Sequence, residues 1–397
     1  MANALLDRLG ATAYAFRGYN VTNLGRSTEL LAHPAYGPVV EGYLRAASEI
    51  CADTMHRKVD LVGRVRRNEE TTVETYHEAM ALIVAVELAQ LRLLEEFFDI
   101  HLKQARMVYG YSLGELTAIC AAGVFEMADA LRIPLSVADD CVALADGVTM
   151  GVLFSRGPLL DFDEVRRLCV KISAAGNGTI GISSYLAPNT VLLLGQRGTI
   201  DLFAEQMHKV FPARVYLRKN NHAWPPVHTP LMWQRNIPNR VAVMLQTLKG
   251  GFTRPSPPVF SLVTGKLSYN DYNARELLVQ WIDQPQRLWD AVYETLASGI
   301  ETVIHVGPDP NLIPATFNRL RDNVQAQLTG NSLNKLGLRA MARVARRPWL
   351  TALLPSRTAL LRAPTVRHII LEDWLLEQPL RRHTDRTQLQ GEAAGNS

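Results

Sequence analysis

The chain has 397 residues, of which 47% are hydrophobic, so it is long enough for two or three domains around a large core. Its 42 basic and 38 acidic residues nearly balance, which argues against a dedicated nucleic-acid binder. The cysteines have no C-x-x-C spacing, which argues against a zinc site and a disulfide framework and favours a reducing cytoplasm. We expect neither a signal peptide nor a membrane-spanning segment.

The chain up to residue 145 predicts two strands and three helices. A strand is expected over 12–18, followed by a polar loop to Gly25. Apolar residues at helical spacing predict helices over 36–55 and 76–99, while the charged stretch 56–72 has no clear period and is interpreted as a loop. The second helix leads into a short strand over 107–109, and another helix, interrupted near Pro134, is expected over 129–145.

The middle of the chain changes pattern. Strands and helices are expected in the order β-α-β-β-α-β between residues 148 and 218, which is the ferredoxin-like arrangement. Helices are then expected over 236–248, 275–281 and 289–298, and strands over 257–262 and 302–306. Strands that alternate with helices on both sides of this insert indicate a mainly parallel sheet covered by helices.

We therefore predict an α/β fold with an α/β-hydrolase-like large domain over 1–147 and 219–330. A ferredoxin-like small subdomain is inserted over 148–218. Residues 331–397 form a basic C-terminal extension with a disordered end.

The sequence Gly110-Tyr111-Ser112-Leu113-Gly114 fits G-x-S-x-G, with a predicted strand before it and helix formers after it. In that context the glycines permit a sharp strand-to-helix turn that exposes the serine hydroxyl. The N–H of Leu113 then faces an oxyanion formed on an acyl group attached to Ser112. The motif predicts a nucleophile at Ser112, and a purely structural turn is the alternative.

A serine nucleophile needs a base, and His228 has the most suggestive setting among the ten histidines. It lies in a proline-bracketed loop, just after the small subdomain returns the chain to the large domain. On the residues alone, a surface-loop histidine remains the competing interpretation.

Four motifs in order carry a family resemblance: Gly-Tyr-Ser-Leu-Gly-Glu, Val-His-Thr-Pro-Leu-Met, Val-Thr-Gly-Lys-Leu and His-Val-Gly-Pro. Over roughly residues 12–325 the chain resembles the malonyl-CoA:acyl-carrier-protein transacylase family, which includes the acyltransferase domains of fatty-acid and polyketide synthases. The resemblance implies that the serine takes an acyl group from coenzyme A and passes it to the phosphopantetheine thiol of an acyl carrier protein.

The resemblance also implies roles for single residues. His228 is the general base, and a backbone carbonyl near Trp281 holds its other ring nitrogen. The backbone N–H groups of Leu113 and Tyr19 form the oxyanion hole. No metal or further cofactor is implied, because coenzyme A enters as part of the substrate. The implied partners are acyl-CoA and an acyl carrier protein, alone or within a synthase complex, in the cytoplasm.

Several positions depart from the family pattern and define the predicted substrate pocket. Tyr111 replaces a histidine, His77 aligns with a glutamine, and Leu186 and Leu262 each replace an asparagine. For His77, a packing or capping histidine is the alternative. Val137 stands where the family has the arginine that pairs with the malonyl carboxylate. The nearby Arg132 lies five residues earlier, on a different helix face. An apolar pocket for an uncharged acyl group is therefore expected.

Other interpretations remain open at this point. An acyl-carrier-protein hydrolase on the same fold needs the same serine and histidine, and a degenerate acyltransferase acting as a docking module needs neither. The C-terminal arginines either face water from helices folded back on the large domain or form a docking surface for an acidic carrier protein. These arginines are Arg339, Arg343, Arg346, Arg347, Arg357, Arg362 and Arg367.

Overall fold

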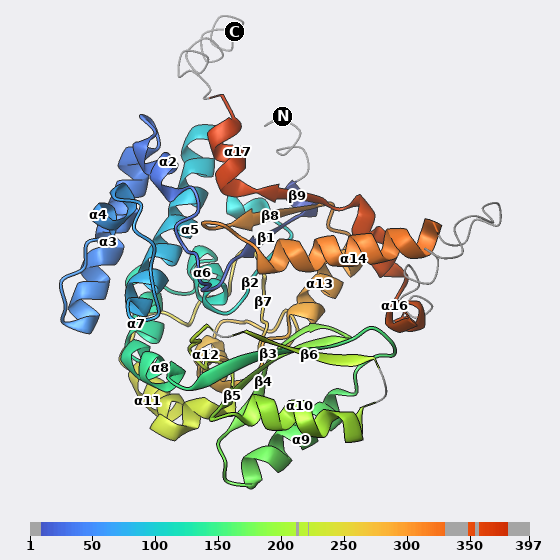
Figure 1. Cartoon of the computed structure of the whole chain (residues 1–397). Coiled ribbons are helices and arrows are strands. Elements are labelled where there is room, and N and C mark those ends of the chain that lie inside the picture. The colour runs from blue at the N-terminus through green and yellow to red at the C-terminus, as the bar shows by residue number, and fades with distance from the viewer. Residues whose placement is uncertain (1–8, 212–213, 221, 330–347, 354–356, 380–397) are drawn as a thin grey trace, which may run out of the picture.

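The computed structural model describes residues 9–211, 214–220, 222–329, 348–353 and 357–379 (Figure 1). The large domain is built on a five-stranded parallel sheet with the strand order β7-β2-β1-β8-β9. Its strands are β1 (Thr12–Phe16), β2 (Met107–Gly110), β7 (Val259–Phe260), β8 (Thr302–Val306) and β9 (Arg367–Ile370). The α/β class and parallel sheet predicted from the sequence are confirmed.

Helices cover both faces of this sheet and bury its central strands throughout. Tyr14 and Phe16 of β1 belong to the core shared with α3 (Gly37–Met55) and α5 (Tyr76–Phe98). Ala13 and Ala15, pointing the other way, belong to the core shared with α13 (Leu288–Ala297) and α14 (Leu312–Thr329). Figure 1 shows α3 and α5 on one side of the sheet and α13 and α14 on the other.

The remaining helices of the large domain pack around these two layers. After β2 come α6 (Leu113–Ala121), α7 (Met127–Leu135) and α8 (Ala138–Ala145), so the helix predicted over 129–145 is divided after Pro134. The others are η1 (Leu9–Ala11), α2 (Ser27–Ala32), η2 (Leu102–Gln104), η3 (Pro230–Arg235), α11 (Ile237–Leu245) and α12 (Ala274–Asp283). No helix in the described part of the chain is long and apolar enough to cross a membrane.

The prediction of a loop over 56–72 is wrong, because this stretch contains the short helix α4 (Leu61–Arg66). Asp60 caps the helix by accepting a hydrogen bond from the Gly63 N–H at 2.8 Å. Arg64 is turned inward, and its Nε lies 2.7 Å from Glu78. A helix of six residues is too short to show a period, and its inward arginine hides the apolar face.

The small subdomain has a four-stranded antiparallel sheet with the order β4-β5-β3-β6. Its elements are β3 (Val148–Ser155), α9 (Phe162–Ala174), β4 (Ile180–Ala187), β5 (Thr190–Gln196), α10 (Thr199–Val210) and β6 (Val215–Asn220). This order confirms the predicted ferredoxin-like arrangement. One face packs on α9 and α10, while Met150, Leu186 and Leu192 on the other join the core of the large domain.

The C-terminal stretch contributes to the large domain. Beyond α16 (Pro348–Leu353) and η5 (Thr358–Thr365), β9 pairs in parallel with β8, and α17 (Leu371–Glu377) follows. Buried Glu372 accepts hydrogen bonds from the backbone N–H groups of Arg26 at 2.9 Å and Asp309 at 2.8 Å. The predicted boundary near residue 330 therefore falls within the large domain. The predicted disordered end, Arg339, Arg343, Arg346 and Arg347 lie outside the described residues.

Candidate active site

Ser112 occupies a sharp turn between the end of β2 at Gly110 and the start of α6 at Leu113. Its backbone angles, φ 55° and ψ −117°, are sparsely populated by residues that carry a side chain. A methyl group added to Gly110 would overlap the backbone of Gly114, and one added to Gly114 would overlap the Phe16 carbonyl. The two glycines therefore permit the strained turn that presents the Ser112 hydroxyl at the end of the sheet.

His228 lies against Ser112 in the loop that follows the small subdomain. Its Nε2 is 2.7 Å from Ser112 Oγ, and its Nδ1 is 2.6 Å from the carbonyl oxygen of Trp281 on α12. The predicted carbonyl partner near Trp281 is thus confirmed. Because a carbonyl only accepts, Nδ1 carries the proton, which leaves Nε2 free to accept the serine proton. The indole N–H of Trp281 also donates to the Ser112 carbonyl at 3.0 Å.

Burial sets the charge state of His228. Only 3% of the surface of this residue is exposed to solvent. Removal from water disfavours the imidazolium and lowers the pKa of His228 to about 4, although the Trp281 carbonyl opposes this shift in part. The ring is therefore neutral at pH 7. A neutral imidazole hydrogen-bonded to a serine hydroxyl is suited to act as a general base.

Two backbone segments border the Ser112 hydroxyl. Leu113 is the first residue of α6, so its N–H has no acceptor within the helix. The loop after β1 passes on the other side, where a Cβ added to Gly18 would lie 3.2 Å from the Ser112 Cβ. Tyr19 is the next residue in that loop. The structure therefore brings together the two segments that the sequence predicts for an oxyanion hole.

The loop that carries Tyr19 is fixed from behind by buried Arg17. The Arg17 Nε donates to the Gly18 carbonyl at 2.8 Å, and Nη2 donates to the Thr22 carbonyl at 3.1 Å. A further guanidinium hydrogen bond goes to the Pro308 carbonyl. Nη2 also donates to the Asn23 side-chain oxygen at 3.0 Å, so Arg17 holds the loop in place through several hydrogen bonds.

A small space, here called the nucleophile chamber, is lined by Ser112, His228 and their neighbours and has a volume of about 20 Å³. Ring centroids lie 4.7 Å apart for Tyr19 and Tyr76 and 5.4 Å apart for Tyr19 and Trp224. None of the described residues that line the chamber is a lysine or arginine. They are Tyr19, Tyr76, Tyr111, Ser112, Ser183, Trp224, Pro225, Val227 and His228.

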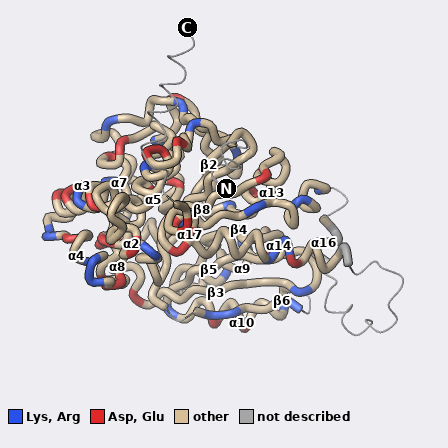
Figure 2. Tube along the Cα trace, turned by 90° about the horizontal axis from the view of Figure 1, so that it is seen from above, with Lys and Arg blue, Asp and Glu red and all other residues tan. Residues whose placement is uncertain are grey.

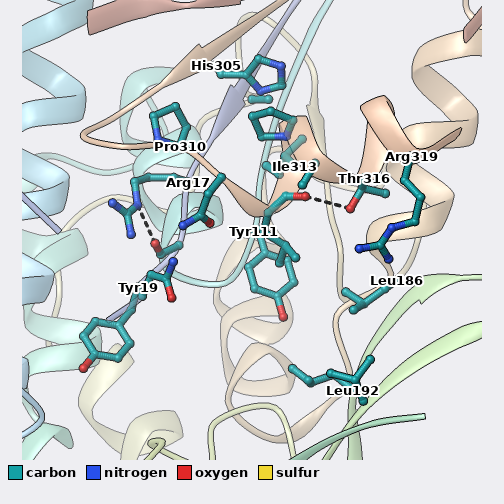
Figure 3. A pocket seen from close by; sticks show the side chains of 18 of the residues that line it. Arg17, Tyr19, Tyr111, Leu186, Leu192, His305, Pro310, Ile313, Thr316 and Arg319 are labelled. Atoms are coloured by element: carbon teal, nitrogen blue, oxygen red, sulfur yellow. Dashed lines mark hydrogen bonds between the residues drawn. The ribbon is translucent and has the colours of Figure 1, made fainter. Parts of the chain in front are cut away.

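A second space, here called the apolar cavity, adjoins the chamber and has a volume of about 390 Å³. The two share Tyr19, Tyr111 and Trp224 as walls. Figure 3 shows Leu186 and Leu192 of the small subdomain on one side of the cavity and Ile313 of α14 on the other. The cavity therefore lies between the small subdomain and the large domain, next to the nucleophile.

A hollow of about 500 Å³, here called the arginine hollow, shares the lining residues Val152 and Arg319 with the apolar cavity. Arg156 and Arg218 also line this hollow. None of the three arginines forms an ion pair with another described residue. In Figure 2 basic residues mark β6, at the end of the molecule where α14 and α16 lie. The apolar cavity thus shares walls with the nucleophile chamber and with a hollow whose arginines have no acidic partner among the described residues.

The predicted pocket residues divide into two groups. Tyr111 lines both the chamber and the apolar cavity, and Leu186 lines the cavity. Val137, His77 and Leu262 line neither space. This corrects the sequence interpretation at those three positions, whose side chains pack inside the protein instead.

The physical reasons differ among the three. Val137 precedes α8 and is 4% exposed within the main core. His77 lies at the start of α5 against Glu78, and burial lowers its pKa. Leu262 is fully buried, and its N–H donates to Glu115 Oε2 at 3.0 Å, which anchors the first turn of α6.

Sequence reasoning missed three residues next to Ser112 and His228, here called the dyad. Tyr76 immediately precedes His77 on α5, so a shift of one residue in the family alignment would have identified it. Trp224 enters the chamber wall from the loop before His228. Gln286, whose side chain contacts both Ser112 and His228, follows α12 in a stretch without any motif. Among the described residues, no group of His, Cys, Asp and Glu is arranged to hold a metal ion.

Comparison with known proteins finds relatives among polyketide synthases and malonyl CoA-acyl carrier protein transacylases. No protein-family model matches the sequence. The chain is 26% identical over 313 residues to mycoketide-CoA synthase of Mycobacterium tuberculosis, covering 79% of this chain but only 7% of the synthase. It is 25% identical over 248 residues to malonyl CoA-acyl carrier protein transacylase of Escherichia coli, covering 60% of this chain and 72% of that enzyme.

Solved structures share the fold. A malonyl-transacylase in complex with a type II polyketide-synthase acyl carrier protein superposes with a TM-score of 0.60 at 21% identity. The superposition covers 77% of this chain and 91% of that chain. The comparisons confirm the predicted resemblance to malonyl-CoA:acyl-carrier-protein transacylases and polyketide-synthase acyltransferase domains, at the low identity of a divergent member.

Proposed function

We propose that this chain, an acyltransferase of the transacylase kind, moves an acyl group from acyl-CoA to the phosphopantetheine thiol of an acyl carrier protein through an ester on Ser112. The observation that carries the proposal is the sequence of contacts Ser112 Oγ, His228 Nε2, His228 Nδ1 and the Trp281 carbonyl, at 2.7 Å and 2.6 Å. It is the geometry of an activated serine whose base is oriented by a third group.

Each half-reaction follows from these positions. Ser112 Oγ attacks the thioester carbonyl while His228 Nε2 takes its proton, and the N–H groups of Leu113 and Tyr19 face the resulting oxyanion. The C–S bond then breaks, and His228 returns the proton to the leaving thiolate. In the second half, His228 accepts the proton of the carrier thiol, whose sulfur attacks the ester carbonyl. The C–O bond breaks, and Ser112 regains its proton.

The connected cavities support a long thioester substrate. Acyl-CoA and the carrier arm share a reactive thioester, a long pantetheine chain and phosphate at the far end. The apolar cavity shares walls with the nucleophile chamber and with the arginine hollow, where Arg156, Arg218 and Arg319 are without acidic partners among the described residues. Guanidinium groups bind phosphate well, and such a positive region also speeds the approach of an acidic carrier.

The chamber lining supports an uncharged acyl group. A malonyl carboxylate enclosed there would lie among Tyr19, Tyr76 and Trp224, with no cation among the described lining residues. Burying an unpaired carboxylate costs several kcal/mol. A loss of about 2 to 4 kcal/mol corresponds to a preference for an uncharged acyl group of about thirty- to a thousandfold. Acetyl or a longer uncharged acyl group is therefore the proposed substrate class.

Two measurements test this function. In the first, acetyl-CoA and malonyl-CoA compete for the protein, and the mass of the acyl-enzyme reports the winner; predominance of malonyl would contradict the proposed specificity. In the second, acyl-enzyme freed of coenzyme A is mixed with a panel of holo carrier proteins, with the apo forms as controls. Acyl-carrier product is expected. Free acid as the main product with every holo carrier would instead indicate a hydrolase.

A further inference from the structure

Gln286 is a fully buried residue in the segment that follows α12, and its backbone is bound to the small subdomain. The Gln286 N–H donates to the Ser183 carbonyl at 2.9 Å. The Gln286 carbonyl accepts from the Tyr185 N–H at 2.8 Å and from the Ser184 hydroxyl at 3.0 Å. Three consecutive residues of β4 therefore fix this one residue of the large domain.

The side chain of Gln286 reaches the dyad from that anchor. Its Oε1 accepts the Ser112 N–H at 3.1 Å, and its Nε2 lies 3.3 Å from His228 Nδ1. The amide orientation follows from the first contact, because the Ser112 N–H requires an acceptor. The NH₂ end then faces Nδ1, whose own proton is directed to the Trp281 carbonyl at 2.6 Å. The amide thus presents the positive end of its dipole to the imidazole.

We propose that Gln286 is a positioning residue through which β4 of the small subdomain fixes the backbone of Ser112 and holds the positive end of an amide dipole against the ring of His228. The inference rests on the acyl-serine function proposed above. It assigns two tasks to one side chain. Oε1 satisfies the buried Ser112 N–H at the strained turn, and the NH₂ group keeps a positive dipole, with no negative charge, beside Nδ1.

The surroundings of His228 make this second task measurable. The titratable side chains that share its chamber are Tyr19, Tyr76 and Tyr111, and burial raises the pKa of each, so all three stay neutral. Outside the chamber, Glu115 of α6 accepts from Leu262 and Tyr269, and Asp283 of α12 accepts from Trp233. A carboxylate at position 286 would thus be the negative charge nearest to Nδ1 among the described residues.

Two variants separate the tasks. Gln286→Met keeps the length of the side chain and removes both polar ends, so the Ser112 N–H loses its acceptor. Gln286→Glu keeps the acceptor and places negative charge beside Nδ1–H, which favours the imidazolium and raises the pKa of His228. The matched control is Gln284→Met, because Gln284 is an exposed glutamine two residues away.

The experiment measures the rate constant of Ser112 acylation by acetyl-CoA between about pH 3.5 and 8, by quenched flow and intact mass. Histidine NMR reports the pKa of His228 independently of turnover. We expect Gln286→Met to slow acylation about tenfold or more, and Gln286→Glu to move both the acid limb and the His228 pKa upward by about one unit or more. Gln284→Met should match the wild type.

Two results would overturn the inference, and they are distinguishable. If the wild type is acylated and folded Gln286→Met and Gln286→Glu keep its rate and its His228 pKa, Gln286 is not a positioning residue. If the wild type takes no acyl group, the acyl-serine function itself fails, and the inference with it. Because the NMR measurement requires only folded protein, the Gln286→Glu variant decides the second task even where acylation is slow.

Discussion

The carbonyl oxygen of Trp281 lies 2.6 Å from Nδ1 of His228, and the two rings also meet edge to face with their centroids 5.1 Å apart. One residue therefore orients the imidazole through its backbone and packs against it through its side chain. This arrangement takes the part that a carboxylate has in a Ser-His-Asp triad, without adding a negative charge. His228 is left as a neutral base whose pKa is set mainly by burial.

The pH dependence of acylation follows from that electrostatic setting. Because the pKa of His228 is lowered to about 4, the base stays unprotonated throughout the neutral range. We expect the acylation rate to stay constant from about pH 8 down to pH 5.5, where an ordinary imidazole with a pKa of about 6.5 would already be mostly protonated. An acid limb centred near pH 6.5 would contradict this expectation.

The same pKa has a consequence for folding that the rate measurement must control for. In the unfolded chain His228 takes up a proton below about pH 6.5, whereas in the folded protein it does so only near pH 4. Lowering the pH through this window therefore favours unfolding. Circular dichroism at each pH distinguishes a loss of folded protein from a loss of the base.

Gly114 should be intolerant of a side chain. In Gly114→Ala the added methyl would overlap the Phe16 carbonyl at the end of β1. We expect the free energy of unfolding to fall by about 2 kcal/mol or more, as for overpacking in a rigid core. The control is Gly42→Ala, in an exposed position of α3 where an added methyl meets no atom within 4 Å. In urea denaturation, Gly42→Ala should be at least as stable as the wild type, by up to about 1 kcal/mol. Equal stability of the two variants would contradict the packing argument.

Arg362 of η5 should stabilise the fold and not serve as a docking residue. Its guanidinium donates to the Leu296 carbonyl at 2.6 Å and the Ile300 carbonyl at 3.1 Å, at the C-terminal end of α13. We expect Arg362→Ala to lower the free energy of unfolding by about 1.5 to 3 kcal/mol. Exposed Arg367 on β9 provides the control, since Arg367→Ala should cost less than about 0.5 kcal/mol. The prediction fails if chemical denaturation finds no difference between these variants.

Val137→Arg should destabilise the protein without creating a malonyl site. The position is 4% exposed within the core, and its side chain does not line the nucleophile chamber. An unpaired guanidinium there costs several kcal/mol. We expect a markedly lower melting temperature together with an unchanged acyl preference. A stable variant that takes malonyl in preference to acetyl would show that residue 137 does reach the acyl group.

The sequence predicted elements whose local pattern is strong. The period of apolar residues in α5 and the order of strands around α9 and α10 are visible without any tertiary information. G-x-S-x-G identifies the turn at Ser112 because the strained backbone needs glycine at both flanks. Short α4 carries too few residues for a period, and β9 is a strand only through its pairing with β8.

The candidate site was predictable to the extent that chemistry depends on residue type. Ser112 and His228 stand out by their motifs, and the structure brings them together. The pocket lining depends instead on which way each side chain points. A shift of one residue on α5 exchanges buried His77 for Tyr76, which faces the chamber. Gln286 has no signature at all, because its importance arises from contacts with Ser112 and β4, distant in sequence.

The mass of the intact protein after incubation with acetyl-CoA tests the central claim most directly. The wild type should gain one acetyl group, mapped by peptide analysis to Ser112, and Ser112→Ala should gain none. His228→Ala should acquire the label orders of magnitude more slowly, because a serine hydroxyl is a weak nucleophile without a base. Persistence of the acetyl group in folded Ser112→Ala, or its absence from the wild type across a panel of acyl-CoAs, would contradict an acyl-serine mechanism.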